Sequence, residues 1–327
     1  MKQHLLVARD YLHEMYGDFL TPEKTCIVLS GPRSGSNLLL RHLEAIGYGK
    51  PVEAFHGNNE RIKREHGWDI NFDDPFEFIS HAIEYQTVKG ICGVKLGWYQ
   101  FQHYLKLARE LFKDYSAPLT DWDLVEVFFT NPSYIHLVRK NKVKQAISFS
   151  KGQQTGVWYI PADDDGEYKN YVLPPVYDRE HIERCFGLVL SVDAQWMTLL
   201  ASDQISHKVV WYEEYVADYE TQLREIDSYM GGVGEITVPE LPLLKLADKT
   251  TLNWVERFES ETPWLKEPLV KKAMEKPDLL LLMALLSNNF FTKAEDQYFL
   301  QMPSTRTKPI RKFYYSVRRK LKKITQI

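Results

Sequence analysis

The sequence has few cysteines and no long apolar run, and both shortages exclude classes of protein. The three cysteines, Cys26, Cys92 and Cys185, lie far apart and form no Cys-x-x-Cys pair, so neither a disulfide framework nor a zinc site is predicted. The longest apolar run, residues 279–286, is too short to cross a bilayer. Residues 1–20 mix acids, bases and histidines with apolar side chains, unlike a secretory signal. We therefore expect a cytoplasmic protein with reduced cysteines.

The composition is that of a soluble globular protein, apart from a basic tail. Of 327 residues, 44% are hydrophobic and 26% are charged, both ordinary values. Residues 304–327 hold nine Lys or Arg and no acid; since the net charge is −3, the rest of the chain carries −12. This tail can serve as a solvated helical end, pack on the body, or contact a phospholipid surface or nucleic acid. We expect one domain over 1–303, followed by the tail, with peripheral membrane contact as an option.

Strand-like and helix-like segments alternate along the chain. The expected strands are residues 25–30, 90–96, 134–138 and 208–212. The helices expected after them are residues 36–46, a segment ending at 111, a segment starting near 142, and 216–230, with a long helix over 179–201 before the last strand. This alternation predicts an α/β fold with a mostly parallel central sheet flanked by helices.

The most informative stretch is Ser30–Leu39, SGPRSGSNLL, between the first strand and its helix. A Gly-rich turn at a helix N-terminus exposes backbone N–H groups that can bind an anion. Gly31 and Gly35 allow close approach of a phosphate, and Arg33 adds a guanidinium. Further donors come from Ser34, Ser36 and Asn37. By itself this pattern also fits an ordinary helix-capping loop.

The turn is not a nucleoside-triphosphate loop, because GxxxxGK[ST] is absent. The third strand also ends in Arg139 where an acid would hold magnesium. We therefore expect the loop to bind a phosphate-bearing substrate without a metal ion.

PRSGSNLL resembles the phosphosulfate loop PRSGSTLL of the Stf0-type sulfotransferases, a bacterial family. Further matches in the right order are Gly93–Leu96 (GVKL), Arg139-Lys140-Asn141, Gln145–Ser148 (QAIS), Gln154–Trp158 (QTGVW), Tyr212–Asp218 (YEEYVAD), and Ala247-Asp248 with Trp254–Phe258 (WVERF). The resemblance covers residues 25–260. It implies the P-loop-NTPase-like sulfotransferase fold. It also implies transfer of a sulfuryl group from 3′-phosphoadenosine-5′-phosphosulfate (PAPS) to a hydroxyl of a small acceptor, with adenosine 3′,5′-bisphosphate as the product.

The resemblance also implies roles for the basic residues. Residues 33–37 would hold the 5′-phosphosulfate, and Arg139 and Ser148, with Lys140, would bind the 3′-phosphate. Three positions depart from the family pattern: Asn37 replaces Thr, Lys140 replaces a second Arg, and Lys245 replaces an Arg that contacts phosphate. Lys245 is retained as a donor-binding candidate.

The family's general base lies in a P-x-E-x-F segment, which Pro51–Phe55 matches, so Glu53 is our candidate. His56 is the second candidate, since its ordinary pKa suits the task, although we favour the interpretation of His56 as an exposed structural histidine over a catalytic role. Glu65 and His66 are candidates without a motif. Lys95 either stabilises the leaving phosphate together with Arg33 or serves as a salt-bridge partner.

Only the composition of two segments indicates the chemical class of the acceptor. Residues 56–85 and 158–180 are rich in aromatic and acidic side chains, which suits a sugar or another natural product. We expect no nucleic-acid partner and a homodimer. Two other functions remain: a nucleotide kinase of related fold, and a non-catalytic protein that binds a membrane or partner through its tail.

Overall fold

The computed structural model describes residues 2–160, 174–234, 236–238, 240 and 249–275. The chain divides into two compact units, the first made of residues 1–138 and 206–243 and the second of 139–205 and 244–327. Each unit is described by itself below. The apolar run 279–286, the basic tail 304–327 and Lys245 lie outside the described residues, and the expected single domain over 1–303 stays a prediction.

The first unit is built on a five-stranded sheet in the order β2-β3-β1-β4-β5. Its strands are β1 (Lys24–Ser30), β2 (Thr87–Val88), β3 (Ile91–Gly97), β4 (Pro132–Val138) and β5 (His207–Trp211). Strands β3, β1, β4 and β5 are parallel, and β2 pairs antiparallel with β3. The predicted α/β fold with a mostly parallel sheet is therefore confirmed. The central strand β1 is buried from Thr25 to Ser30, as expected of a strand covered on both faces.

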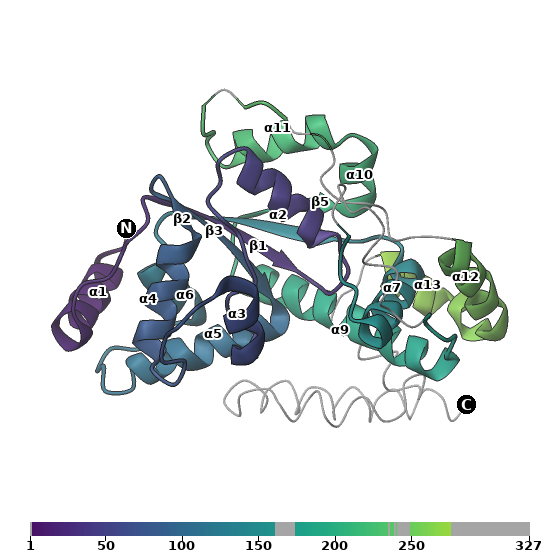
Figure 1. The fold of residues 1–327 in the computed structure, drawn as a ribbon, viewed down its shortest axis with the longest axis horizontal. Coiled ribbons are helices and arrows are strands. Elements are labelled where there is room, and N and C mark those ends of the chain that lie inside the picture. The colour runs from purple at the N-terminus through teal and green to yellow at the C-terminus, as the bar shows by residue number, and fades with distance from the viewer. Residues whose placement is uncertain (1, 161–173, 235, 239, 241–248, 276–327) are drawn as a thin grey trace. The chain divides into compact units, whose positions relative to one another are not determined.

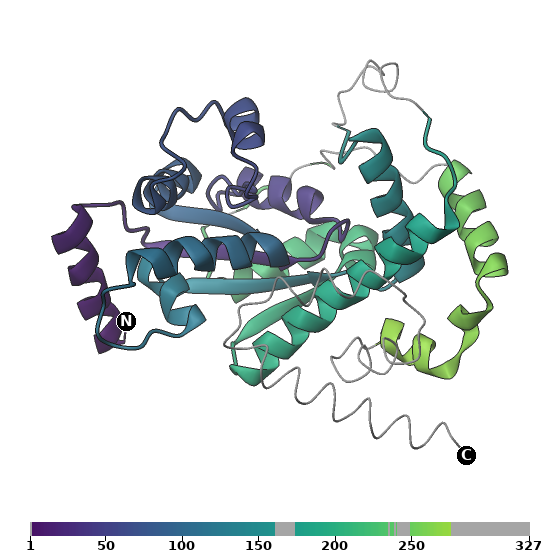
Figure 2. The same ribbon diagram turned by 90° about the horizontal axis from the view of Figure 1, so that it is seen from below.

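Helices cover both faces of this sheet (Figure 1, Figure 2). One face carries α2 (Ser36–Ala45), α10 (Tyr212–Ala217) and α11 (Tyr219–Tyr229); the other carries α4 (Pro75–Gln86), α5 (Trp98–Leu111) and α6 (Asp121–Phe128). Two further helices, α1 (Gln3–Tyr16) and α3 (Asn59–His66), complete the unit. Because β1 leads to α2 on one face and β3 leads to α5 on the other, the connections diverge between β1 and β3. Ligands of open α/β sheets bind at such a point.

The helical segment expected over residues 216–230 is confirmed for most of its length, but it consists of the end of α10 and the whole of α11, divided at Asp218. The Asp218 carboxylate accepts a hydrogen bond from the N–H of Thr221 at 3.2 Å and caps α11. Aspartate favours this capping position over the helix interior. Tyr212, expected at the end of the fourth strand, is instead the first residue of α10.

The described residues of the second unit are mainly helical. It contains α7 (Lys142–Thr155), α9 (Arg179–Ser202), α12 (Lys249–Glu261), a 3₁₀ turn (Pro263–Lys266) and α13 (Pro268–Glu275). Apolar side chains of α7, α9 and α12, among them Ile147, Phe186 and Phe258, form its core. By length and composition α9 could span a membrane, but 61% of its most apolar window is buried. It also carries the buried Asp193, so we interpret α9 as the core helix of this unit.

Candidate active site

The loop between β1 and α2 has a strained backbone. Arg33 has a φ of 59° and Gly35 a φ of 94°, the left-handed region that non-glycine residues enter at a cost. Ser34 is buried, and its hydroxyl donates to the carbonyl oxygen of Gly31 at 3.0 Å. The side chain of Ser34 therefore closes the loop. Strain held in place by such a contact is typical of a functional site.

Besides its left-handed φ, Gly35 lies so close to Tyr212 that a side chain there would force a shift. A Cβ atom there would lie 2.2 Å from Cδ2 of Tyr212. The Tyr212 ring thus packs directly on the loop from the start of α10. Tyr212 belongs to the YEEYVAD segment that matches the family pattern. In the structure the ring of Tyr212 packs against the loop and supports it.

The first turn of α2 directly follows this loop and begins at Ser36. The first N–H groups of a helix have no partner within it, and the helix dipole makes them attractive to anions. Leu38 and Leu39 donate back to the carbonyl of Gly35, which leaves the N–H groups of Ser36 and Asn37 at the open end of the turn. A glycine cradle, a helix N-terminus and Arg33 together fit a phosphate or sulfate group.

Glu53 is placed by a backbone bridge on the edge of β3. Val52 pairs parallel with Val94, beyond the point where β2 stops pairing at Cys92. The chain can approach this closely because a Cβ atom on Gly93 would lie 2.3 Å from the carbonyl oxygen of Tyr48. One residue after the bridge, Glu53 and Lys95 stand side by side. Lys95 is two residues before Gly97, which pairs with Ser30 at the start of the loop.

The Lys95 ammonium donates to the Glu53 carboxylate, and the two form an ion pair. The Lys95 side chain is 10% exposed and that of Glu53 is 23% exposed. Burial alone would raise the pKa of Glu53, but Lys95, Arg61 and His56 outweigh it and lower that pKa to about 2. In the absence of ligands Glu53 is therefore ionised throughout the physiological range. Of the two roles expected for Lys95, the structure shows the one as a salt-bridge partner.

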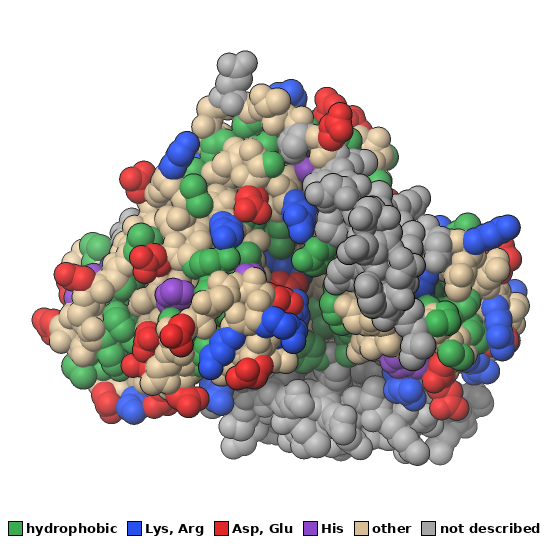
Figure 3. All heavy atoms as spheres, viewed as in Figure 1, with side chains coloured by type: hydrophobic (Ala, Val, Ile, Leu, Met, Phe, Trp, Pro, Cys, Tyr) green, Lys and Arg blue, Asp and Glu red, His purple; other side chains and the backbone are tan. Residues whose placement is uncertain are grey.

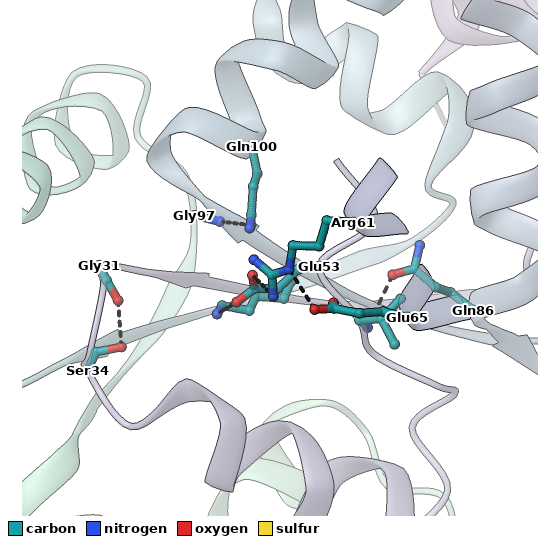
Figure 4. A network of polar contacts seen from close by, with 10 residues as sticks. Gly31, Ser34, Glu53, Arg61, Glu65, Gln86, Gly97 and Gln100 are labelled. Carbon is teal, nitrogen blue, oxygen red and sulfur yellow. Dashed lines mark hydrogen bonds and ion pairs between the residues drawn. The ribbon is translucent and has the colours of Figure 1, made fainter. Parts of the chain in front are cut away.

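Arg61 of α3 holds the other oxygen of the same carboxylate. Its Nη2 lies 3.6 Å from Oε2 of Glu53, and its Nε donates to Oε1 of Glu65 at 2.8 Å. Figure 4 shows these contacts in one view with the Gly31–Ser34 hydrogen bond. The helix is short, but Asn58 caps it by accepting from the N–H of Arg61. In Figure 3, side chains of both charges gather over α3.

The other base candidates take different places. His56 reaches the surface, but partial desolvation of its imidazole, followed by the charge of Arg61, lowers its pKa from the ordinary value of 6.5, which favours the neutral form at pH 7. Glu65 is engaged by Arg61. His66 lies 3.5 Å from the hydroxyl of Tyr85 and packs beside Trp68. The structure thus places Glu53, and not these residues, against both cations.

The predicted 3′-phosphate residues lie in the second unit. Arg139 follows Val138, the last residue of β4, and Lys140 is exposed. Ser148 lies within α7, whose N-cap Asn141 accepts from the N–H of Lys144 at 2.8 Å. Beneath them, Lys142 donates to the carbonyl oxygen of Arg139 and to the Asp193 carboxylate. Burial raises the pKa of Asp193, and Lys142 opposes that rise.

Sequence reasoning did not find Arg61, Tyr212 or Lys142 as site residues. Arg61 and Glu65 have the i,i+4 spacing of a helical ion pair, a signal that could have been used. Lys142 was hidden in the basic run 139–144, where burial cannot be seen from the letters.

Comparison with known proteins gives consistent relatives. The family model described as Stf0 sulphotransferase matches residues 25–261. Trehalose 2-sulfotransferase of Mycolicibacterium smegmatis is 27% identical over 268 residues, covering 72% of this chain and 94% of that protein. The Mycobacterium tuberculosis protein of the same name is 24% identical, covering 74% and 97%. A solved sulfotransferase domain of a Synechococcus olefin synthase has a TM-score of 0.34 at 16% identity, covering 74% and 96%. By its family match, this chain belongs to the Stf0 sulphotransferase family.

Proposed function

We propose that this sulfotransferase takes the sulfuryl group from PAPS and transfers it to a hydroxyl of a small sugar. The observation that carries the proposal is the Glu53–Lys95 pair, placed on the strand next to the one that leads into the Gly31–Asn37 loop. A base, a cation and an anion cradle at one sheet edge are what in-line transfer of a sulfuryl group requires.

In this proposal Glu53 takes the proton of the acceptor hydroxyl as its oxygen bonds to sulfur. The bond between sulfur and the bridging oxygen breaks, and its electron pair leaves with adenosine 3′,5′-bisphosphate. Arg33 and the N–H groups of Ser34–Asn37 stabilise the charge that develops on that oxygen. PAPS supplies the activated sulfuryl group, and the protein contributes position and charge.

Lys95 would have two partners in succession. Without the donor it neutralises Glu53. When the phosphosulfate enters, its charge draws the ammonium away, and the pKa of Glu53 rises because burial is then less compensated. Glu53 would thereby become a stronger base when the donor is present. The same movement would bring a cation to the leaving group.

The choice of a sugar rests on the two trehalose 2-sulfotransferases among the relatives and on the charged residues around Glu53. Arg61 and Glu65 provide donors and acceptors, and such mixtures bind hydroxyl groups well. Trehalose is therefore the first acceptor to test, followed by other disaccharides.

Calorimetry tests the donor without knowledge of the acceptor. Wild-type protein should bind adenosine 3′,5′-bisphosphate at least tenfold more tightly than 5′-AMP, and Arg139→Ala should remove most of this preference. Arg184→Ala, which removes an exposed arginine of the second unit outside the matched motifs, is the control and should leave it intact. Equal affinity of the wild type for both nucleotides would reject PAPS as the donor. A magnesium requirement for transfer would favour a kinase.

A further inference from the structure

Lys142 and Asp193 form a buried ion pair in the core of the second unit. Lys142 is 1% exposed and Asp193 is fully buried, and the ammonium donates to Oδ2 of the carboxylate. The other carboxylate oxygen, Oδ1, has no hydrogen-bond partner among the described residues. Apart from the Lys142 contact, the charge of Asp193 is therefore poorly compensated.

This pair is an expensive way to join two helices. Removing an ammonium and a carboxylate from water costs several kcal/mol per ion, and apolar residues of similar volume often serve stability equally well. Lys142 is also the first residue of α7, where the helix dipole disfavours a cation. The neighbouring Val143 and Ala146 already pack α7 on α9 through apolar contacts.

The contacts of the Lys142 ammonium suggest a role for this buried pair other than stability. Besides Asp193 it holds the carbonyl oxygen of Arg139, three residues earlier. The turn from Arg139 to the helix start is thus fixed at two points: Asn141 caps the first turn through the N–H of Lys144, and Lys142 ties the main chain of Arg139 to α9. Arg139, Lys140 and Ser148, the residues that the family resemblance assigns to the 3′-phosphate, belong to this same segment.

We propose that the Lys142–Asp193 pair is a positioning element for 3′-phosphate recognition: it fixes the main chain of Arg139 relative to α7, and so sets the preference for a 3′-phosphorylated nucleotide. The pair acts through Arg139 and does not touch the ligand itself. This inference rests on the proposed donor site.

The test replaces the pair by apolar residues of similar volume, Lys142→Met with Asp193→Leu, since removing one partner alone would leave a buried charge. The control variant Glu180→Gln with Arg184→Gln removes an exposed pair of α9 with the same charge change. Calorimetry with adenosine 3′,5′-bisphosphate and 5′-AMP is run on both variants after thermal melting has shown a cooperative transition.

We expect the double variant to bind adenosine 3′,5′-bisphosphate about tenfold more weakly, a loss of about 1.4 kcal/mol, with 5′-AMP affinity nearly unchanged. The control should keep both affinities. A folded double variant that keeps the wild-type preference, or weakens both nucleotides equally, would overturn the positioning role. Should it not fold, Lys142→Met with Asp193→Asn removes the ammonium with less change in polarity, and the same ratio decides. A wild type without any preference would instead overturn the proposed donor, and the inference with it.

Discussion

The carboxylate of Glu53 and the ammonium of Lys95 are paired at the carboxyl end of β3, one residue beyond the backbone bridge between Val52 and Val94. The bridge matters because it turns a loop glutamate into a residue held by the sheet. A base held on a strand keeps its orientation better than one on a free loop.

Glu53→Gln should lower the rate of sulfuryl transfer about 10²–10⁴-fold, the range of general-base catalysis, and should leave the affinity for adenosine 3′,5′-bisphosphate within a few-fold. Single-turnover transfer from labelled PAPS to an acceptor accepted by the wild type measures the first, and calorimetry the second. Glu60→Gln, an exposed carboxylate on α3, is the matched control. Full activity of Glu53→Gln would remove Glu53 from the mechanism.

The low pKa of Glu53 also predicts how stability depends on pH. A group whose folded pKa of about 2 lies below its ordinary value of 4.5 stabilises the fold above pH 4.5. That contribution is lost as the pH falls from 4.5 to 2. Its upper limit is roughly 3 kcal/mol. Chemical denaturation should show wild type more stable than Glu53→Gln at pH 7, with the difference shrinking through this window. A difference that is constant with pH would contradict the assignment.

Arg61→Ala should move the acid limb of kcat/KM to higher pH. The reason is that Glu53 loses one of its cations, so its pKa rises. Arg61→Lys keeps the positive charge but loses the forked guanidinium that joins Glu53 to Glu65. Its acid limb should lie between those of the wild type and Arg61→Ala. Lys63→Ala, which removes an exposed cation of the same helix, should match the wild type. An unmoved acid limb in Arg61→Ala would show that Arg61 does not tune the base.

Gly35→Ala should abolish measurable binding of adenosine 3′,5′-bisphosphate. The new methyl group would collide with the Tyr212 ring in addition to straining the backbone. Gly17→Ala is the matched control, because Gly17 has nearly the same φ of 95° but no atom within 4 Å of the new Cβ. It should cost only backbone strain, roughly 1–3 kcal/mol of stability. Normal nucleotide binding by Gly35→Ala would show that the loop tolerates this crowding.

The sequence predicted the sheet well because apolar runs bounded by turn residues are a local signal. The strands ending at Ser30, Gly97 and Val138 lie within two residues of their predicted bounds. The loop and Glu53 were predicted from motifs that combine residue type with spacing. That both lie at the carboxyl ends of neighbouring strands depends on the strand order, which a local sequence pattern does not contain.

What the sequence could not provide are contacts between distant segments. The Tyr212 ring reaches Gly35 across 177 positions, and Lys142 meets Asp193 across 51. Both contacts depend on tertiary packing between segments that are far apart in the sequence. The break at Asp218 is different, since a capping aspartate is a local signal; here the helical pattern on both sides concealed it.

The most direct test of the account is a crystal structure with adenosine 3′,5′-bisphosphate bound. We predict the 5′-phosphate within hydrogen-bond distance of the N–H groups of Ser36 and Asn37, with the Lys95 ammonium turned from Glu53 toward it. A nucleotide bound away from the Gly31–Asn37 loop, with the Glu53–Lys95 pair unchanged, would contradict the proposed mechanism.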